Sequence, residues 1–165
     1  MERIKLEATD KEAVDLVVDH VGIAVISITE AVEHWQRVFG YQPKTEVVTN
    51  TRQKVRVIFL GKANSIDIKL IEPSDESSPI YAFARRGGGL HHLCMRCRSV
   101  EKELARLNAL GLRTLSPPAP GEAFSNEPIA FLYANHGLNV ELIDTDKRAL
   151  RIDREPDPGI PEESA

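Results

Sequence analysis

The stretch VDHVGIAV at residues 18–25 decides the fold, because it has a counterpart, LHHLCMRC, at residues 90–97. Adding 72 to a position in the first half of the chain lands on its counterpart in the second half. His20 thus corresponds to His92, and Lys69 corresponds to Glu141. Segments far from these residues obey the same offset, so the chain is predicted to contain one supersecondary unit twice.

The composition is that of an ordinary globular domain. The chain has 165 residues, of which 42% are hydrophobic and 28% charged, as expected for one compact domain or two halves that share a core. A net charge of −4 offers no basic field for a polyanion, so nucleic acid is not expected as a partner. No apolar run is long enough to cross a membrane, and residues 1–5 carry no apolar signal core. We therefore expect a cytoplasmic protein.

Each half is predicted to fold as β-α-β-β-β. Ser27 and Ser99 are predicted N-caps of amphipathic helices that end at Gly40 and Gly111. The fold class is α+β, with two tandem modules that form a curved mixed sheet around a central cavity. Strands are predicted at residues 17–25, 45–49, 54–61 and 65–72, and again at 90–97, 112–115, 127–133 and 137–144.

The predicted domain covers residues 17–145, with modules at 17–73 and 90–145. A linker with a short helix is expected between them, at residues 74–89. Residues 1–16 read as an N-terminal arm. Residues 146–165 are charged and contain prolines, which predicts a flexible C-terminal tail.

Strand alternation assigns side chains to the two faces of the predicted sheet. We expect Val57, Phe59, Ile129 and Phe131 to pack against the helices, with Ile58 and Ala130 on the opposite face, and His91 to point away from the cavity. So many polar groups on one face indicate the lining of a cavity rather than a core. That face is predicted to carry His20, Arg56, Asp67, Lys69, His92, Arg96 and Glu141.

Several motifs resemble the vicinal oxygen chelate superfamily, which includes glyoxalases, bleomycin-resistance proteins and dioxygenases. The resemblance is strongest to members of the methylmalonyl-CoA epimerase type and covers about residues 17–145. It implies two β-α-β-β-β modules around a divalent metal that orients a substrate and stabilises an enolate. The motifs are DHVGIAV at 19–25, IEP at 71–73, SPI at 78–80, GLHH at 89–92 and VEL at 140–142.

The resemblance places His20, His92 and Glu141 on three of four metal-ligand positions. A His2Glu set can hold zinc, cobalt, nickel, iron or manganese. The fourth position, where the family has Glu or Gln, is Lys69, and a protonated lysine has no lone pair for a metal. The position near residues 55–59 where the epimerases carry a carboxylate base is occupied by Arg56 and Ile58.

Two hypotheses follow from the lysine. In the first, the protein is a glyoxalase- or epimerase-type isomerase or lyase that moves a proton beside the carbonyl of an acid, thioester or ketone. Glu141 and Lys69 are then the catalytic residues, and Arg56, Arg96 and Asp67 contact an anionic substrate. In the second, Lys69 pairs with Glu141 and replaces the metal, and the protein binds or sequesters a small molecule.

A third possibility follows from the same donor set, since two histidines and one carboxylate also form the iron site of dioxygenases. Exposed apolar faces and the family resemblance further predict a homodimer.

Overall fold

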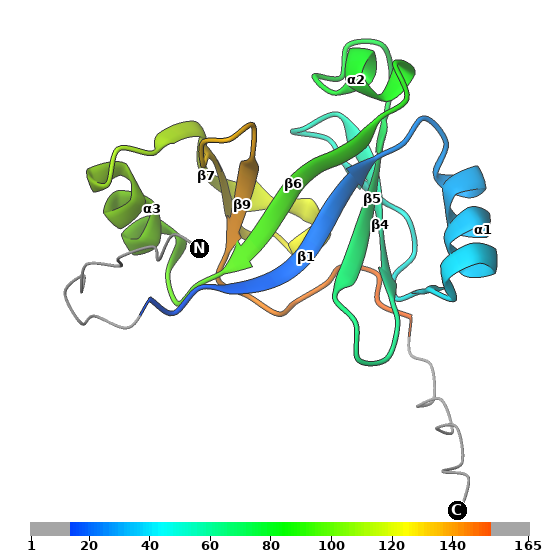
Figure 1. Cartoon of the computed structure of the whole chain (residues 1–165), viewed down its shortest axis with the longest axis horizontal. Helices are drawn as coiled ribbons and strands as arrows, with labels where there is room; N and C mark the ends of the chain where they lie inside the picture. The colour runs from blue at the N-terminus through cyan, green and yellow to red at the C-terminus, as the bar shows by residue number, and fades with distance from the viewer. Residues whose placement is uncertain (1–13, 153–165) are drawn as a thin grey trace, which may run out of the picture.

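The computed structural model describes residues 14–152, and its strands form a single sheet (Figure 1). The strand order is β2-β4-β5-β1-β6-β9-β8-β7, with β3 paired to β4. No helix within residues 14–152 is long and apolar enough to cross a membrane. The first module contains β1 (Val17–Ala24), α1 (Ile28–Phe39), β2 (Gln42–Pro43), β3 (Val48–Asn50), β4 (Val55–Gly61) and β5 (Asp67–Pro73).

The second module repeats this order after the short helix α2 (Tyr81–Arg85), which confirms the predicted α+β class with duplicated β-α-β-β-β units. The strand predicted at 45–49 is instead two short strands, and the one predicted at 112–115 extends to Gly121. The module contains β6 (Gly89–Arg96), α3 (Val100–Ala109), β7 (Arg113–Gly121), the 3-10 turn η1 (Glu122–Phe124), β8 (Glu127–Tyr133) and β9 (Asn139–Ile143).

The helices begin where the sequence places their caps. The hydroxyl of Ser27 accepts a hydrogen bond from the N–H of Glu30, and that of Ser99 accepts one from Lys102. In Figure 1, α1 and α3 lie on opposite sides of the central strands β1 and β6. Each module therefore has its own helix on the outer face of its part of the sheet.

The first strands of the two modules pair antiparallel at the centre of the sheet. Gly22 lies opposite His92, and His20 lies opposite Cys94. Each of these strands also pairs in parallel with the last strand of its own module, β1 with β5 and β6 with β9. Residues that the 72-residue offset relates are thereby brought to the same point of the sheet.

Two β-bulges interrupt the central pairing, one in each strand. The register shifts between Val18 and His20, and again where Gly22–Ile23 faces Leu90–His92. The extra residues are Asp19 and His91, which the 72-residue offset also relates. Because a bulge breaks strict alternation, His91 contacts His92 instead of pointing away (Nδ1 to Nδ1, 2.9 Å). The prediction for His91 was therefore wrong.

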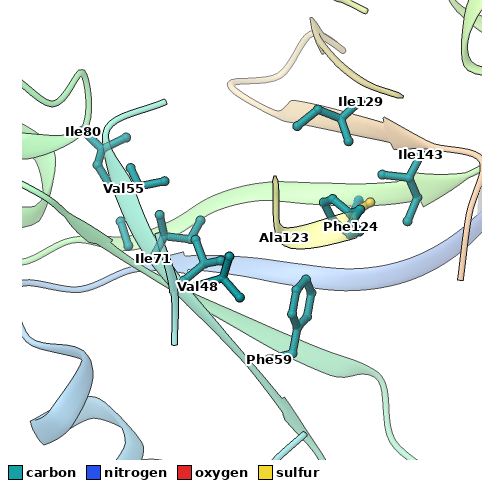
Figure 2. Close-up of a cluster of buried hydrophobic side chains, with 12 residues drawn as sticks. Val48, Val55, Phe59, Ile71, Ile80, Ala123, Phe124, Ile129 and Ile143 are labelled. Atoms are coloured by element: carbon teal, nitrogen blue, oxygen red, sulfur yellow. The ribbon is translucent and has the colours of Figure 1, made fainter. Parts of the chain in front are cut away.

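The interior of the curved sheet is packed with apolar side chains (Figure 2). This interior cluster includes Val57, Phe59 and Ile129, with Phe131 against it. Ile58 and Ala130 lie in the separate clusters under the helices. The predicted faces of β4 and β8 are thus reversed. Both faces of these strands are apolar, so alternation alone did not distinguish the inside from the outside.

The C-terminal segment crosses back to the first module. The N–H of Glu46 donates to the carbonyl of Leu150, and the N–H of Ile152 donates to that of Lys44. The predicted tail begins at residue 146, so its first seven residues include this hydrogen-bonded crossing. The remainder of the tail and residues 1–13 of the arm lie outside the described residues.

Gly22 leaves the space that the His92 ring occupies. A Cβ at this position would lie 2.3 Å from His92 Cε1, so we expect Gly22→Ala to lower the free energy of unfolding by about 1–3 kcal/mol through overpacking. Urea denaturation measures the change. In a His92→Ala background the clash disappears, and the same substitution should cost much less. Equal costs in both backgrounds would contradict this explanation.

Candidate functional site

Four polar side chains meet inside the protein, each from a different central strand. His20 comes from β1, Lys69 from β5, His92 from β6 and Glu141 from β9. They are 0%, 2%, 1% and 0% exposed. The sequence predicted that these four residues share a face, and the structure brings them together as one buried cluster rather than as the lining of an open cavity.

Three ligand-type atoms of this cluster form a small triangle. Glu141 Oε2 lies 3.1 Å from His20 Nε2 and 3.0 Å from His92 Nε2. The two Nε2 atoms are 3.4 Å apart. Ligands of one tetrahedral ion at about 2.0–2.2 Å are separated by similar distances, so the donor set fits a small divalent metal.

Asp19 determines which nitrogen of His20 faces this triangle. Its Oδ1 lies 2.8 Å from His20 Nδ1, and its pKa is lowered: burial raises it, but the His20 hydrogen bond and Arg148 outweigh that effect. A carboxylate here requires a proton on Nδ1. In neutral His20 the lone pair on Nε2 then points towards Glu141, as in the carboxylate–histidine–metal arrangement.

The second histidine has an equivalent outer partner. His91 contacts His92 through the two Nδ1 atoms, so one ring donates and the other accepts. Burial lowers the pKa of His92 to about 4, although Glu141 opposes this shift. His92 is therefore neutral at pH 7 and can present a lone pair.

Lys69 contacts both oxygens of Glu141. Its Nζ lies 3.2 Å from Oε1 and 3.3 Å from Oε2, so an ammonium group lies where the resemblance predicted a fourth ligand. Burial raises the pKa of Glu141, but Lys69 and the two histidines outweigh burial and hold the pKa well below its usual range. Glu141 is thus a carboxylate whose two oxygens both contact cationic or hydrogen-bonding partners.

Aromatic rings and one arginine close the cluster. Phe59 and Phe124 contact each other at 5.7 Å between ring centroids, and both appear in the interior cluster of Figure 2. The guanidinium of Arg148 lies 4.5 Å and 5.0 Å from their centroids and pairs with Asp19. Arg148 lies in the predicted tail, where no motif marked it.

The other predicted ligand-binding residues lie elsewhere. Arg56 was expected on the cavity face. It instead shares the outer face of β4 with Ile58, two residues further along the strand, and pairs there with Glu72 at 2.9 Å. Asp67 pairs with Lys44 at 2.6 Å. Asp67 and Arg96 line a pocket beside Asp19. Reversal of the faces of β4 explains the error for Arg56.

Two residues that sequence reasoning missed are Asp19 and Arg148. Asp19 carried a signal, because it shares the 72-residue offset with His91 and directly precedes the histidine. Arg148 carried none, since its position depends on the path of the chain after β9. The pairing of these two residues joins the C-terminal segment to the cluster.

The fold and the cluster together define a duplicated β-α-β-β-β protein in which the two modules share a buried His2Glu site. Residues 19–131 match the family described as Glyoxalase/Bleomycin resistance protein/Dioxygenase superfamily. The chain belongs to this superfamily.

Named relatives agree with this assignment. The uncharacterized protein YqjC of Bacillus subtilis is 33% identical over 131 residues, which cover 75% of this chain and 89% of YqjC. The mitochondrial methylmalonyl-CoA epimerase of Dictyostelium discoideum is 30% identical over 128 residues, 75% of each chain. The crystal structure of methylmalonyl-CoA epimerase from Mycobacterium tuberculosis superimposes with a TM-score of 0.68 at 31% identity, covering 77% of this chain and 86% of that one.

Removal of the Lys69 charge should destabilise the metal-free protein. Lys69→Met leaves the Glu141 carboxylate buried without its ammonium partner, so we expect a loss of about 3–5 kcal/mol in the free energy of unfolding. Chemical denaturation after chelator treatment measures it. Lys44→Met is the matched control, because the Lys44–Asp67 pair is partly exposed and should contribute about 1 kcal/mol or less. Similar losses in both variants would argue against a buried charge pair.

The metal-free protein should also lose stability as the pH falls from about 6.5 to about 4. Unfolded His92 takes up a proton near pH 6.5, whereas folded His92 does so only at about 4. Between these values the unfolded state binds more protons, so the free energy of unfolding decreases with decreasing pH. His91, whose pKa is also lowered by burial, adds to the effect.

Urea titrations at pH 7, 6 and 5 measure this slope. His92→Gln removes the titrating ring and should flatten it. A wild-type unfolding free energy that is constant over this range would contradict the prediction.

Proposed function

We propose that the protein is a divalent-metal-assisted enzyme that moves a proton beside the carbonyl of a small acid, thioester or ketone. The observation that carries the proposal is the contact of Asp19 with His20 Nδ1. With Nδ1 as the donor to Asp19, Nε2 of His20 faces a carboxylate oxygen of Glu141 3.1 Å away. A lone pair and a carboxylate oxygen held this close form two of the contacts that a divalent cation could bridge.

The chain's own residues would hold that cation and act around it. His20, His92 and Glu141 would be the ligands, for zinc, cobalt, nickel, iron or manganese. A bound divalent ion would supply Lewis-acid polarisation of the substrate carbonyl. The neutral state of His92, caused by burial, suits ligation in the tautomer whose Nδ1 donates to His91 and whose Nε2 carries a lone pair.

Proton transfer would use Glu141 and Lys69 as a pair. The lowered pKa of Glu141 keeps it ionised, and a carboxylate can accept a proton, although the lowered pKa makes it a weaker base. The Glu141 carboxylate would take the proton from the carbon beside the carbonyl while the electron pair moves onto the carbonyl oxygen. The Lys69 ammonium lies about 3.2 Å from Glu141. It would stabilise the negative charge that develops on the carbonyl oxygen of the substrate.

The named relatives suggest which substrates to test first. Methylmalonyl-CoA epimerases are among them, so an acyl-CoA thioester with an acidic α-hydrogen is the first candidate. The lysine at the fourth position and the apolar interior residues of β4, Val55, Val57 and Phe59, argue against assigning methylmalonyl-CoA itself. The anionic substrate and the homodimer stay predictions.

A second candidate function is metal-free binding of a small molecule. The contacts of Lys69 Nζ with both oxygens of Glu141 favour it, because the ammonium already compensates the carboxylate charge. In this case doubly protonated His20 would donate to both Asp19 and Glu141, and no ion would be required.

Metal analysis of the purified protein separates the two functions. We expect about one divalent ion per chain after incubation with zinc, cobalt, nickel, iron or manganese, and loss of that ion in His92→Ala. Asp19→Asn should bind the metal about 10–100-fold more weakly, because it weakens control of the His20 tautomer. His136→Ala is the control, since His136 is exposed in a turn. No bound ion in the wild-type protein would favour the metal-free function.

Hydrogen exchange then tests the chemistry. In D2O the metal-loaded protein should replace the α-hydrogen of an acyl-CoA thioester, which proton NMR follows. Glu141→Gln should abolish exchange. A protein that binds metal but exchanges no α-hydrogen in acyl-CoA, 2-oxo acid or hydroxyketone substrates would refute proton transfer as the reaction.

A further inference from the structure

A pocket of about 220 Å³ lies next to the buried cluster, where the C-terminal segment crosses back to the first module. The crossing segment runs below β1 in Figure 1. Every residue that lines the pocket is charged, and three of them belong to the C-terminal segment. The lining residues are Asp19, Lys44, Asp67, Arg96, Asp146, Arg148 and Arg151.

The pocket is lined by more cationic than anionic side chains. Two of its three carboxylates are taken, Asp67 by Lys44 and Asp19 by Arg148. Within residues 14–152, neither Arg96 nor Arg151 has a carboxylate within ion-pair distance. Four cations against three carboxylates leave a net charge of one positive unit. Two guanidinium groups that form no ion pair within residues 14–152 thus face a space of limited size, and that of Arg96 acts on Asp19 only as a nearby charge.

Arg148 connects this charged pocket to the buried cluster. Its side chain is 8% exposed, and its Nε is buried without a hydrogen-bond partner among the described residues. The rings of Phe59 and Phe124, which contact Arg148, also contact Lys69 Nζ at 5.7 Å and 4.9 Å. Asp19 lines the pocket and hydrogen-bonds to His20. An occupant of the pocket would therefore lie one side chain away from a predicted metal ligand.

We propose that this pocket binds the carboxylate of a small organic acid, with Arg96 and Arg151 as its principal cationic partners. A guanidinium pairs with a carboxylate through two parallel hydrogen bonds. A single surplus positive charge matches a monoanion, whereas a phosphate dianion would carry one negative charge more than the lining compensates. At about 30 Å³ per water in the liquid, the volume admits an acid of a few carbon atoms and excludes a whole nucleotide.

The subsite does not depend on a metal. The proposed function enters at one point only, the identification of the bound acid as part of the enzyme's substrate. The binding experiment is therefore done on the full chain after chelator treatment, so that its outcome is independent of metal analysis.

Titration with sodium propionate, followed by the backbone amide signals in NMR spectra, tests the site. We expect saturable shifts at residues around Lys44, Arg96 and Arg151, and no saturable shifts with propionamide, its neutral isostere. Arg151→Gln and Arg96→Gln should each weaken propionate binding about tenfold, as expected for loss of a charge-assisted pair. Because Arg151 is exposed, Arg151→Gln is expected to fold. Arg86→Gln, the same change at the exposed residue that caps the C-terminus of α2, should leave binding unchanged.

Three outcomes would overturn the inference. They are equal binding of propionamide, wild-type propionate affinity in both pocket variants, and tighter binding of inorganic phosphate at the same residues. The last would reassign the pocket to phosphate groups. If the protein binds propionate but no metal, only the metal-assisted function is refuted. If it binds metal but no propionate, only the carboxylate subsite is refuted.

Discussion

The antiparallel contact between β1 and β6 is the constraint on which the rest of the structure depends. It relates the two modules, and its register places Gly22 opposite His92. A side chain at residue 22 would occupy the position of the imidazole, so the strand pairing and the site share one steric requirement. The two bulges in this pairing turn Asp19 and His91 towards the histidines. The same contact thus assembles the fold, brings the site residues together and supplies their outer hydrogen-bond partners.

Burial of charge is the main energetic problem of this interior. Removing a carboxylate from water is costly unless it is paired, and Glu141 is 0% exposed. Lys69 and the histidines compensate it, while Arg148 compensates Asp19. The metal-assisted and metal-free functions differ in which cation completes this compensation. A divalent ion would share Glu141 with Lys69, so the lysine would lower the affinity that the three ligands alone would have. The lysine at the fourth position therefore distinguishes this site from a set of four metal ligands, because it adds a positive charge where a fourth ligand would donate a lone pair.

Much of the site was predictable because duplication converts sequence positions into spatial ones. The 72-residue offset predicted that His20, His92, Lys69 and Glu141 lie at equivalent points, and the structure confirms that they meet. Alternation failed at two kinds of place. On β4 both faces are apolar, so the outward position of Arg56 was assigned to the wrong side. At the central bulges an extra residue changes the direction of the next side chain, which the pattern of polar and apolar residues does not reveal.

The sequence by itself determined the order of the elements, the duplication and the identity of the four buried residues, because these follow from local patterns and a fixed spacing. Only the tertiary structure decided which face of each strand is inside, and that Arg148 returns from beyond β9 to pair with Asp19. It also decided that Arg96 and Arg151 face one pocket. These features depend on the curvature of the sheet and the path of the C-terminal segment. Both are set by contacts between residues far apart in the chain, for which no local pattern exists.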